Sequence, residues 1–288
     1  MKKIAFIGLG TMGFHMASHI QLANFDTTVF NRTKLKSNEW NQKFGGHVAE
    51  SVLKAGGGQE AVFLCLGRDE DVRTTLLGEI GLLQSMKRGS IIVDHTTTSA
   101  GLAQEMFHES KKKGIHFMDA PVSGGEVGAK NGTLTVMLGG EIEVYTEIMP
   151  VIDCYSKFSK LMGGPGSGQL TKMVNQICLA GLIQGLAEGL NFTEKVELDS
   201  KDVIEVISKG AAQSWQMDNR AESMTKDFFD HGFAVDLMRK DLSIAIKEAQ
   251  KNNLSLEVTS LVDSFYEDIQ NMGGGAWDTS SLIRRLKK

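Results

Sequence analysis

The 288-residue sequence lacks the features of an exported or membrane-bound chain. No apolar run approaches the roughly 20 residues that cross a bilayer. The N-terminal segment MKKIAFIGLG reaches glycines too early for the apolar core of a signal peptide. These absences predict a protein of the cytoplasm with no membrane partner.

The sequence also lacks long stretches of charge of one sign. Its formal net charge is −4, and acidic and basic residues are interspersed. There is no basic stripe for nucleic acid and no acidic block of the kind found in disordered tails. We therefore expect no nucleic-acid partner.

Residues that build metal and nucleophile sites are scarce. The three cysteines, Cys65, Cys154 and Cys178, are far apart in apolar surroundings, which predicts reduced thiols in protein cores. The seven histidines form no HxH pair and have no cysteine partner at zinc spacing, so we expect no metal, and only His95 ends a predicted strand. A GxSxG elbow and a P-loop are absent, which argues against the commonest hydrolases and phosphoryl transferases.

The length exceeds the usual size of one hydrophobic core, so two domains are expected. Apolar runs alternate with helical patterns up to residue 165, and from residue 166 the period is helical almost throughout. We predict an α/β Rossmann domain over 1–165 and an all-helical domain over 166–288, joined by a long interdomain helix from about 168 to 195. Further helices are expected near 200–208, 214–226, 232–250, 255–271 and 279–286.

The first apolar run, Ile4–Ile7, leads directly into the glycine motif Gly8-Leu9-Gly10-Thr11-Met12-Gly13, and a helical pattern follows. Strand, GxGxxG and helix in this order predict dinucleotide binding, although a tight turn without a ligand is the alternative. Gly8 permits the turn, Gly10 lets the backbone approach a pyrophosphate, and Gly13 allows close packing of helix on strand. The helix N-terminus would bind the phosphates.

The second predicted strand, Thr27–Phe30, ends in Asn31-Arg32-Thr33, where an NAD site would carry Asp or Glu for the ribose hydroxyls. The nearest acid, Asp26, precedes the strand and is expected at its opposite end. Arg32 could bind a 2′-phosphate, with help from Asn31 and Thr33, or could be a solvated loop residue. We expect NADP to be preferred, with NAD as the alternative.

Two later strands end in residues placed where open α/β sheets bind ligands. Ala61–Leu66 is followed by Gly67, and Ile91–Asp94 by His95-Thr96-Thr97-Thr98-Ser99. The hydroxyl groups of the second segment could contact ribose or nicotinamide. Ser99 could instead cap the helix that follows.

The strand predicted over Ile115–Asp119 runs into Ala120-Pro121-Val122-Ser123-Gly124-Gly125-Glu126. Successive N–H groups around two glycines can form an anion-binding concavity, to which Ser123 adds a hydroxyl donor. This turn is a candidate clamp for a substrate carboxylate, and an ordinary turn at the sheet edge is the alternative. One more strand is expected over Thr133–Leu138, before a short segment around Tyr155 to Phe158.

Lys172 and Asn175 lie three residues apart on the predicted long helix, so they share one helix face. A lysine where two domains meet can reach a cleft, whereas a solvated helix lysine is the alternative. Lys240, beside Asp241, lies in the middle of a later helix and taken alone would be a surface lysine.

Gly181, Gly185 and Gly189 recur every fourth residue on one face of the long helix. Helical glycines reduce stability unless another backbone packs closely against them. That backbone could belong to the same chain or to a second copy.

Four segments together resemble the β-hydroxyacid dehydrogenase family over essentially the whole chain. They are IAFIGLGTMG, DAPVSGGEVGAKNGTLTVMLGG, GSGQLTKMVNQ and FAVDLMRKDLSIA, in this order. The family includes 3-hydroxyisobutyrate dehydrogenases, tartronate semialdehyde reductases and glyoxylate/succinic semialdehyde reductases. The resemblance implies an NAD(P)-dependent enzyme, a homodimer or homotetramer, that transfers a hydride between nicotinamide and a small β-hydroxy acid or its semialdehyde.

The resemblance also implies the roles of residues at matching positions. Lys172 would be the general acid/base, and Asn175 would orient the same substrate oxygen. Ser123, Gly124 and Gly125 would bind the substrate. The implied cofactor-binding residues are Gly8, Leu9, Gly10, Thr11, Met12, Gly13, Asn31, Arg32, Thr33, Leu66, Gly67, Thr97 and Lys240.

A few positions separate this chain from the family's usual pattern and from its relatives. Gly67 stands where members commonly have proline, and Thr96 where serine is usual. Gln176 replaces the histidine of 6-phosphogluconate dehydrogenases, and Lys172 is a residue that imine reductases and non-catalytic relatives lack. A nucleotide-sensing or scaffolding module without turnover is the alternative from another class.

Overall fold

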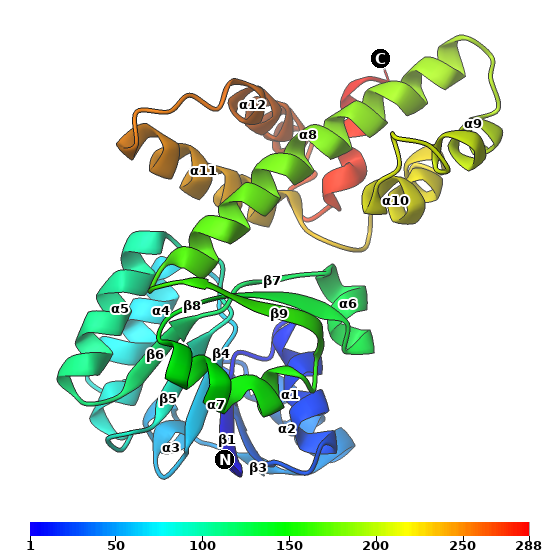
Figure 1. The fold of residues 1–288 in the computed structure, drawn as a ribbon. Coiled ribbons are helices and arrows are strands. Elements are labelled where there is room, and N and C mark those ends of the chain that lie inside the picture. The colour runs from blue at the N-terminus through cyan, green and yellow to red at the C-terminus, as the bar shows by residue number, and fades with distance from the viewer. Residues whose placement is uncertain (288) are drawn as a thin grey trace. The chain divides into compact units, whose positions relative to one another are not determined.

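The structure is a computed structural model, and it describes residues 1–287. The chain forms two compact units, one over Met1–Lys172 and one from Met173 onward. The longest helix, α8 (Ser167–Lys195), begins in the first unit and continues into the second (Figure 1). None of the described helices is long and apolar enough to cross a membrane.

The first unit is built on a nine-stranded sheet (Figure 1). In sheet order the strands are β3 (His47–Val48), β2 (Asp26–Phe30), β1 (Lys3–Ile7), β4 (Ala61–Leu64), β5 (Ile91–Asp94), β6 (His116–Asp119), β8 (Leu134–Gly139) and β7 (Val122–Ser123), and β9 (Ser156–Gly163) also pairs with β8. The strands from β3 to β6 are parallel, whereas β8 is antiparallel to β6 and β7. The predicted Rossmann fold is confirmed.

Hydrophobic clusters lie on both faces of this sheet, beneath its helices. Ile4 and Phe6 belong to one cluster and Ala5 and Ile7 to the other, and all four are almost completely buried. Burial on both faces explains why β1 reads as a continuous apolar run. The helices of this unit are α1 (Gly13–Leu22), α2 (Lys34–Phe44), α3 (Val52–Gly56), α4 (Asp69–Leu77), the 3₁₀ helix η1 (Leu82–Gln84), α5 (Ala100–Lys112), α6 (Gly125–Asn131) and α7 (Ile142–Ile152).

Two strands differ from their predicted extents. The strand expected over Ala61–Leu66 ends at Leu64, because the N–H of Leu66 donates to a side chain, Thr96 Oγ1, at 2.9 Å. The short segment expected near Tyr155 is the eight-residue strand β9, which runs parallel to β8. No residue of β9 is fully buried, so it lacks the apolar run by which the other strands are recognised.

The second unit is helical, as predicted. After α8 it contains α9 (Ser200–Ile207), α10 (Trp215–Thr225), α11 (Val235–Lys251), α12 (Glu257–Asn271) and η2 (Thr279–Arg285). The last element is a 3₁₀ helix and not an α-helix. Ala180, Ile183, Ala187 and Leu190 recur at helical spacing on α8 and supply one side of the core of this unit.

Candidate active site

The three glycines of the first turn face different surroundings. A Cβ atom at Gly8 would lie 2.2 Å from the carbonyl oxygen of Cys65, and one at Gly13 would lie 1.9 Å from that of Gly8. Gly8 also has φ +97°, which favours glycine. A Cβ at Gly10 would meet no atom within 4 Å. The fold itself therefore needs Gly8 and Gly13, whereas the space beside Gly10 is open to a ligand.

The backbone around Gly10 offers unpaired hydrogen-bond donors. The N–H groups of Gly10, Thr11 and Met12 have no acceptor among residues 1–287. The N-terminus of α1 has neither a side-chain cap nor an acidic residue in its first turn. Free N–H groups at the positive end of a helix dipole bind anions, so this turn fits the pyrophosphate of a dinucleotide.

The side chain of Asn31 holds the glycine turn in place. Its Oδ1 accepts a hydrogen bond from the N–H of Leu9 at 2.9 Å, and its Nδ2 donates to the carbonyl of Thr33 at 3.1 Å. The Asn31 amide is thus engaged by the protein through its oxygen and one hydrogen of Nδ2, and donation of the second hydrogen to a 2′-phosphate stays a prediction. The sequence offered no signal for this contact, which joins residues 22 positions apart.

Arg32 and Thr33 are exposed at the carboxyl end of β2. Helix α2 begins directly after them and has no acidic residue in its first turn and no side-chain cap. Asp26 is the first residue of β2, where it forms an ion pair with His47 at 3.1 Å. Because Asp26 and Arg32 flank opposite ends of the strand, no carboxylate of β2 opposes a phosphate beside Arg32.

The loops after β4 and β5 contact each other. Thr96 Oγ1 accepts a hydrogen bond from the N–H of Leu66, and the Thr96 N–H donates to Asp94 Oδ1, both at 2.9 Å. Gly67 is exposed and Thr97 half-buried. The structure therefore brings three of the predicted cofactor residues, Leu66, Gly67 and Thr97, onto two connected loops.

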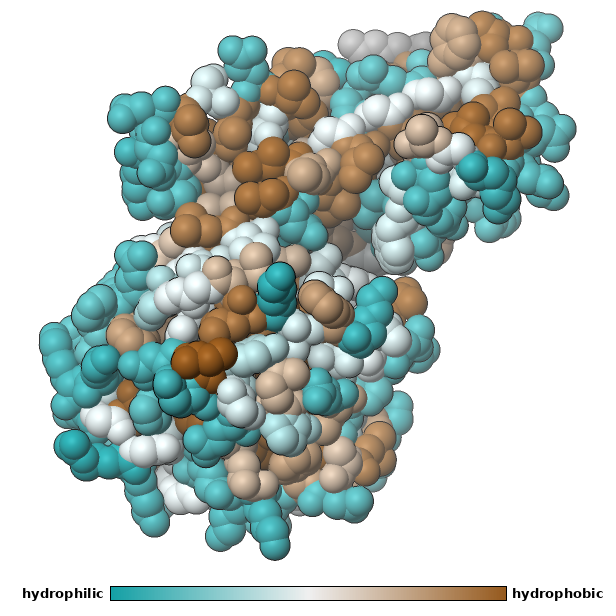
Figure 2. Space-filling view, in the orientation of Figure 1, coloured by the Kyte–Doolittle hydropathy of each residue, from teal (hydrophilic) through white to brown (hydrophobic). Residues whose placement is uncertain are grey.

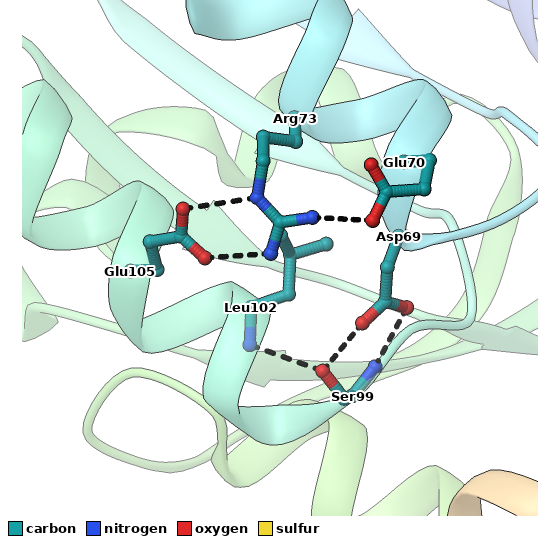
Figure 3. Close-up of polar contacts among 6 residues, drawn as sticks. All are labelled: Asp69, Glu70, Arg73, Ser99, Leu102 and Glu105. Atoms are coloured by element: carbon teal, nitrogen blue, oxygen red, sulfur yellow. Dashed lines mark hydrogen bonds and ion pairs between the residues drawn. The ribbon is translucent and has the colours of Figure 1, made fainter.

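Polar contacts between α4 and α5 fix the ends of these loops (Figure 3). Ser99 Oγ donates to Asp69 at 2.6 Å and accepts from the N–H of Leu102, so Ser99 caps α5. Further along both helices, the guanidinium of Arg73 binds the carboxylate of Glu105 through two hydrogen bonds of 3.0 and 2.8 Å (Figure 3).

Two buried carboxyl groups, Asp94 and Asp119, end the neighbouring strands β5 and β6 and pair in register. Burial raises the pKa of Asp94 to about 7, against the opposing effect of hydrogen bonds from Thr96. Burial likewise raises the pKa of Asp119 to about 6, opposed by bonds from backbone N–H groups at the start of α8. Both groups favour the neutral form at mildly acid pH.

The raised pKa of Asp94 predicts a pH-dependent stability. Below pH 3.8, the ordinary value, Asp94 is protonated in the folded and the unfolded chain, and its shifted pKa costs no stability. As the pH rises from 3.8 through the folded value of about 7, the carboxyl ionises more easily in the unfolded chain, so the free energy of unfolding falls. Asp94→Asn removes this titration, so its free energy of unfolding relative to wild type should rise by about 2–3 kcal/mol between pH 5 and pH 8. Urea unfolding at both pH values measures it, with the exposed Asp230→Asn as control. A difference that does not change with pH would contradict the prediction.

His95 is a buried structural residue. Its Nδ1 lies 2.6 Å from the carbonyl oxygen of Ala120 and its Nε2 lies 2.9 Å from the hydroxyl of Tyr155. A carbonyl can only accept, so Nδ1 carries the proton and Nε2 accepts from Tyr155. Burial lowers the pKa of His95 to about 4, so the ring is neutral at physiological pH and ties the end of β5 to the turn after β6.

The turn that follows contains the predicted substrate clamp. Ser123 lies on the short strand β7 opposite Thr135, and Gly124 and Gly125 follow with φ of +132° and +61°. Both glycines adopt backbone conformations that other residues rarely take. Ser123, Gly124 and Gly125 are all partly exposed, and α6 begins here without a side-chain cap.

Lys172 is the last residue of the first unit, in the second turn of α8, and only 8% of it is exposed. A buried lysine is unusual and is not a solvated helix residue.

In the second unit, Asn175 and Lys240 belong to one chain of polar contacts. Asn175 Nδ2 donates to Gln176 Oε1 at 2.8 Å, and Gln176 Nε2 donates to Asp241 Oδ2 at 2.7 Å. The ammonium group of Lys240 lies 3.1 Å from Asp241 Oδ1. Sequence reasoning missed the connecting residues Gln176 and Asp241, although each is adjacent to a predicted site residue.

One of the three cysteines differs from its predicted environment. Cys178 is exposed and so is not the core thiol that was expected, whereas Cys65 and Cys154 are partly buried and pack against a hydrophobic core cluster. Cys178 lies on the exposed face of α8 with Val174 and Leu182, so apolar sequence neighbours did not indicate burial here. The described residues contain no group of three His, Cys, Asp or Glu side chains that could hold a metal ion.

Comparison with known proteins agrees with this geometry. Residues 3–165 match the family described as the NAD binding domain of 6-phosphogluconate dehydrogenase. Residues 166–286 match the family described as the NAD-binding domain of NADP-dependent 3-hydroxyisobutyrate dehydrogenase. These matches define the chain as an NAD(P)-dependent oxidoreductase.

Individual relatives cover nearly the whole chain. It is 53% identical to an uncharacterized oxidoreductase of Shewanella frigidimarina, over 100% of this chain and 99% of that protein. It is 30% identical to the 2-hydroxy-3-oxopropionate reductase of Escherichia coli, over 99% and 97%. The solved structure of Mycobacterium tuberculosis 3-hydroxyisobutyrate dehydrogenase with L-serine is 26% identical, with a TM-score of 0.90 over 100% of both chains. The chain belongs to the β-hydroxyacid dehydrogenase family, as its sequence predicted.

Proposed function

We propose that this enzyme interconverts a small β-hydroxy acid and its semialdehyde, with Lys172 as general acid/base. In reduction Lys172 gives a proton to the carbonyl oxygen, and in oxidation it takes the proton from the hydroxyl. The burial of Lys172 carries this proposal, because an amine shielded from bulk water can exchange its proton directly with a bound reactant. Bound nicotinamide supplies or accepts the hydride.

Other residues of the chain bind and orient the reactants in this proposal. Asn175 holds the substrate oxygen that exchanges its proton with Lys172. Ser123 and the backbone of Gly124 and Gly125 bind the substrate carboxylate, and Lys240 contributes positive charge. In this proposal residues 1–165 bind the cofactor. Residues 166–288 supply substrate contacts and a surface for a second copy of the chain. The enzyme works in the cytoplasm.

A reductase assay tests the proposal directly. Oxidation of NADPH is followed with glyoxylate, succinic semialdehyde, tartronate semialdehyde and methylmalonate semialdehyde, and the reverse reaction with 3-hydroxyisobutyrate and NADP⁺. We expect turnover with at least one of these small carboxylates. Tight NADPH binding without turnover of any of them would favour the nucleotide-sensing alternative.

We propose that the enzyme prefers NADPH and that Arg32 reads the 2′-phosphate. The guanidinium is exposed, and no carboxylate stands nearby on β2 to repel a phosphate. A charge-assisted hydrogen bond contributes about 1.5–3 kcal/mol, and exposure to solvent reduces this. Arg32→Ala should therefore lower the ratio of kcat/KM for NADPH to that for NADH by about tenfold, mainly through KM for NADPH.

The matched control is Arg88→Ala, which removes the same charge from an exposed loop before the amino end of the central strand β5, whereas Arg32 follows the carboxyl end of β2. It should leave the cofactor ratio unchanged. An unchanged ratio in Arg32→Ala would show that this arginine does not distinguish the two cofactors.

We also propose that a second copy of the chain packs against α8. A Cβ at Gly185 or Gly189 would meet nothing within 4 Å, and one at Gly181 would meet only Val258, at 4.0 Å. The backbone that was expected to pack here is therefore not supplied by residues 1–287. Helix α9 buries no residue at all, although one face of it is apolar.

Hydrophobic side chains gather over α8 and around its C-terminal end (Figure 2). The exposed ones in the second unit include Leu182, Phe192, Val196, Leu198 and Val206. A hydrophobic surface of this kind commonly marks an interface between subunits.

This surface predicts a dimer or tetramer at micromolar concentration in analytical ultracentrifugation. Gly185→Arg should shift the protein to monomer, because the long side chain blocks close backbone packing. Gly101→Arg, at an exposed glycine of α5 that also has nothing within 4 Å, is the control and should keep the wild-type assembly. A wild-type protein that sediments only as a monomer would refute the interface.

A further inference from the structure

We propose that Gln169 is a positioning residue that sets Lys172 against the loop after β5, which carries Thr97. The inference rests on the proposed role of Lys172 and adds a residue that does not itself contact the reactants. Gln169 lies three residues before Lys172 on α8, one helical turn away. All residues of the argument belong to the first unit.

The side chain of Gln169 uses both ends of its amide on one loop. Its Oε1 accepts the N–H of Thr98 at 3.0 Å, and its Nε2 donates to the carbonyl of Thr96 at 2.7 Å. Gln169 is fully buried, so water cannot replace these bonds. Two bonds from one planar group fix both the distance and the rotation of α8 relative to the loop.

The carboxylate of Asp119 holds the backbone at the same point. Its two oxygens accept the N–H groups of Gly166 at 2.8 Å and of Gln169 at 2.9 Å, and so it caps the start of α8 from the end of β6. A Cβ at Gly168 would lie 2.4 Å from the carbonyl oxygen of Met137. The first turn of α8 therefore sits directly on the sheet and has no room to shift.

The loop that Gln169 holds is in turn tied to the next cofactor loop, because Thr96 Oγ1 accepts the N–H of Leu66. A continuous set of hydrogen bonds thus runs from Leu66 through Thr96 to Gln169. Lys172 follows on the same rigid helix. A misplacement of about 1 Å between reacting groups can reduce a rate by 10²-fold, so loss of these hydrogen bonds should lower the rate of the enzyme.

The test is Gln169→Met, which keeps the length of the side chain and removes both hydrogen bonds. We expect kcat, measured with NADPH and the semialdehyde of the panel that the wild type reduces fastest, to fall about 10- to 100-fold, while KM for each reactant changes less than about threefold. Gln169→Glu retains an acceptor for the Thr98 N–H and, when protonated, a donor for the Thr96 carbonyl, so it serves as a milder variant that should lose less as the pH is lowered. Gln184→Met is the control, since Gln184 is also buried on α8 but bonds only to Glu188 of the same helix.

A double variant separates positioning from a general loss of structure. In the Lys172→Ala background, Gln169→Met should reduce the residual rate by less than about twofold, because the group that it positions is gone. A further reduction equal to that in wild type would overturn the proposal, and so would an unchanged kcat in Gln169→Met. Wild-type turnover in Lys172→Ala alone would instead refute the proposed function. Thermal unfolding of each variant, compared with Gln184→Met, identifies any that fail to fold. If Gln169→Met does not fold, kcat of Gln169→Glu takes its place as the measurement, and an unchanged kcat would overturn the proposal.

Discussion

Lys172→Ala is expected to lower kcat by about 10²- to 10⁴-fold, which is the range that general acid–base catalysis contributes. Without the lysine, the carbonyl oxygen must take its proton from water while the hydride is transferred. The glycine turn and the loops that bind the cofactor are untouched, so KM for NADPH should stay within about threefold of the wild-type value. Steady-state rates at varied NADPH and a saturating concentration of a semialdehyde that the wild type reduces measure both quantities.

Lys195→Ala provides the matched control, because Lys195 is an exposed lysine in the last turn of the same helix. It loses the same charge at a point remote in sequence from the site and should keep wild-type kcat. If Lys172→Ala retained wild-type turnover, Lys172 would not be the general acid/base, whatever its burial.

Gly13→Ala is expected to lower the free energy of unfolding by more than about 3 kcal/mol, or to prevent folding. Its Cβ would lie 1.9 Å from the carbonyl oxygen of Gly8 and 2.9 Å from the ring of Phe6, and neither the backbone nor a buried ring can move away easily. The helix α1 would have to separate from β1. Urea unfolding measures the change.

Gly10→Ala adds the same methyl group three residues earlier, where nothing lies within 4 Å. Its free energy of unfolding should change by less than about 0.5 kcal/mol. KM for NADPH should nevertheless rise about tenfold, because the methyl group occupies the space through which the backbone approaches the pyrophosphate. Equal effects of the two substitutions on stability would contradict this division of roles.

Sequence periodicity was sufficient to predict the strands and helices whose apolar residues are buried. β1, β5 and the long helix α8 were predicted to within a residue or two, because burial on one or both faces leaves a regular pattern. β9 was not, since it has no fully buried residue.

The contacts that organise the site could not be predicted in the same way. Gln169 bonds to residues more than 70 positions away, and Asn31 to one 22 positions away. A buried amide has no periodic signature, and its partners become visible only when the strands are placed side by side. For the glycines of α8 the sequence pattern is visible but incomplete. Their spacing predicts that a backbone packs against this face, but it does not specify whether the same chain or a second copy supplies that backbone.

The glycine turn also bears on how such a sequence would diverge. Gly8 and Gly13 are held by the fold, so mutation and selection would retain them even in a descendant that no longer bound a nucleotide. Gly10 is held only by the ligand. In a lineage that abandoned the cofactor, Gly10 should therefore be the first of the three to drift. The identity of the residue at this one position would then separate descendants that still use the cofactor from those that keep only the scaffold.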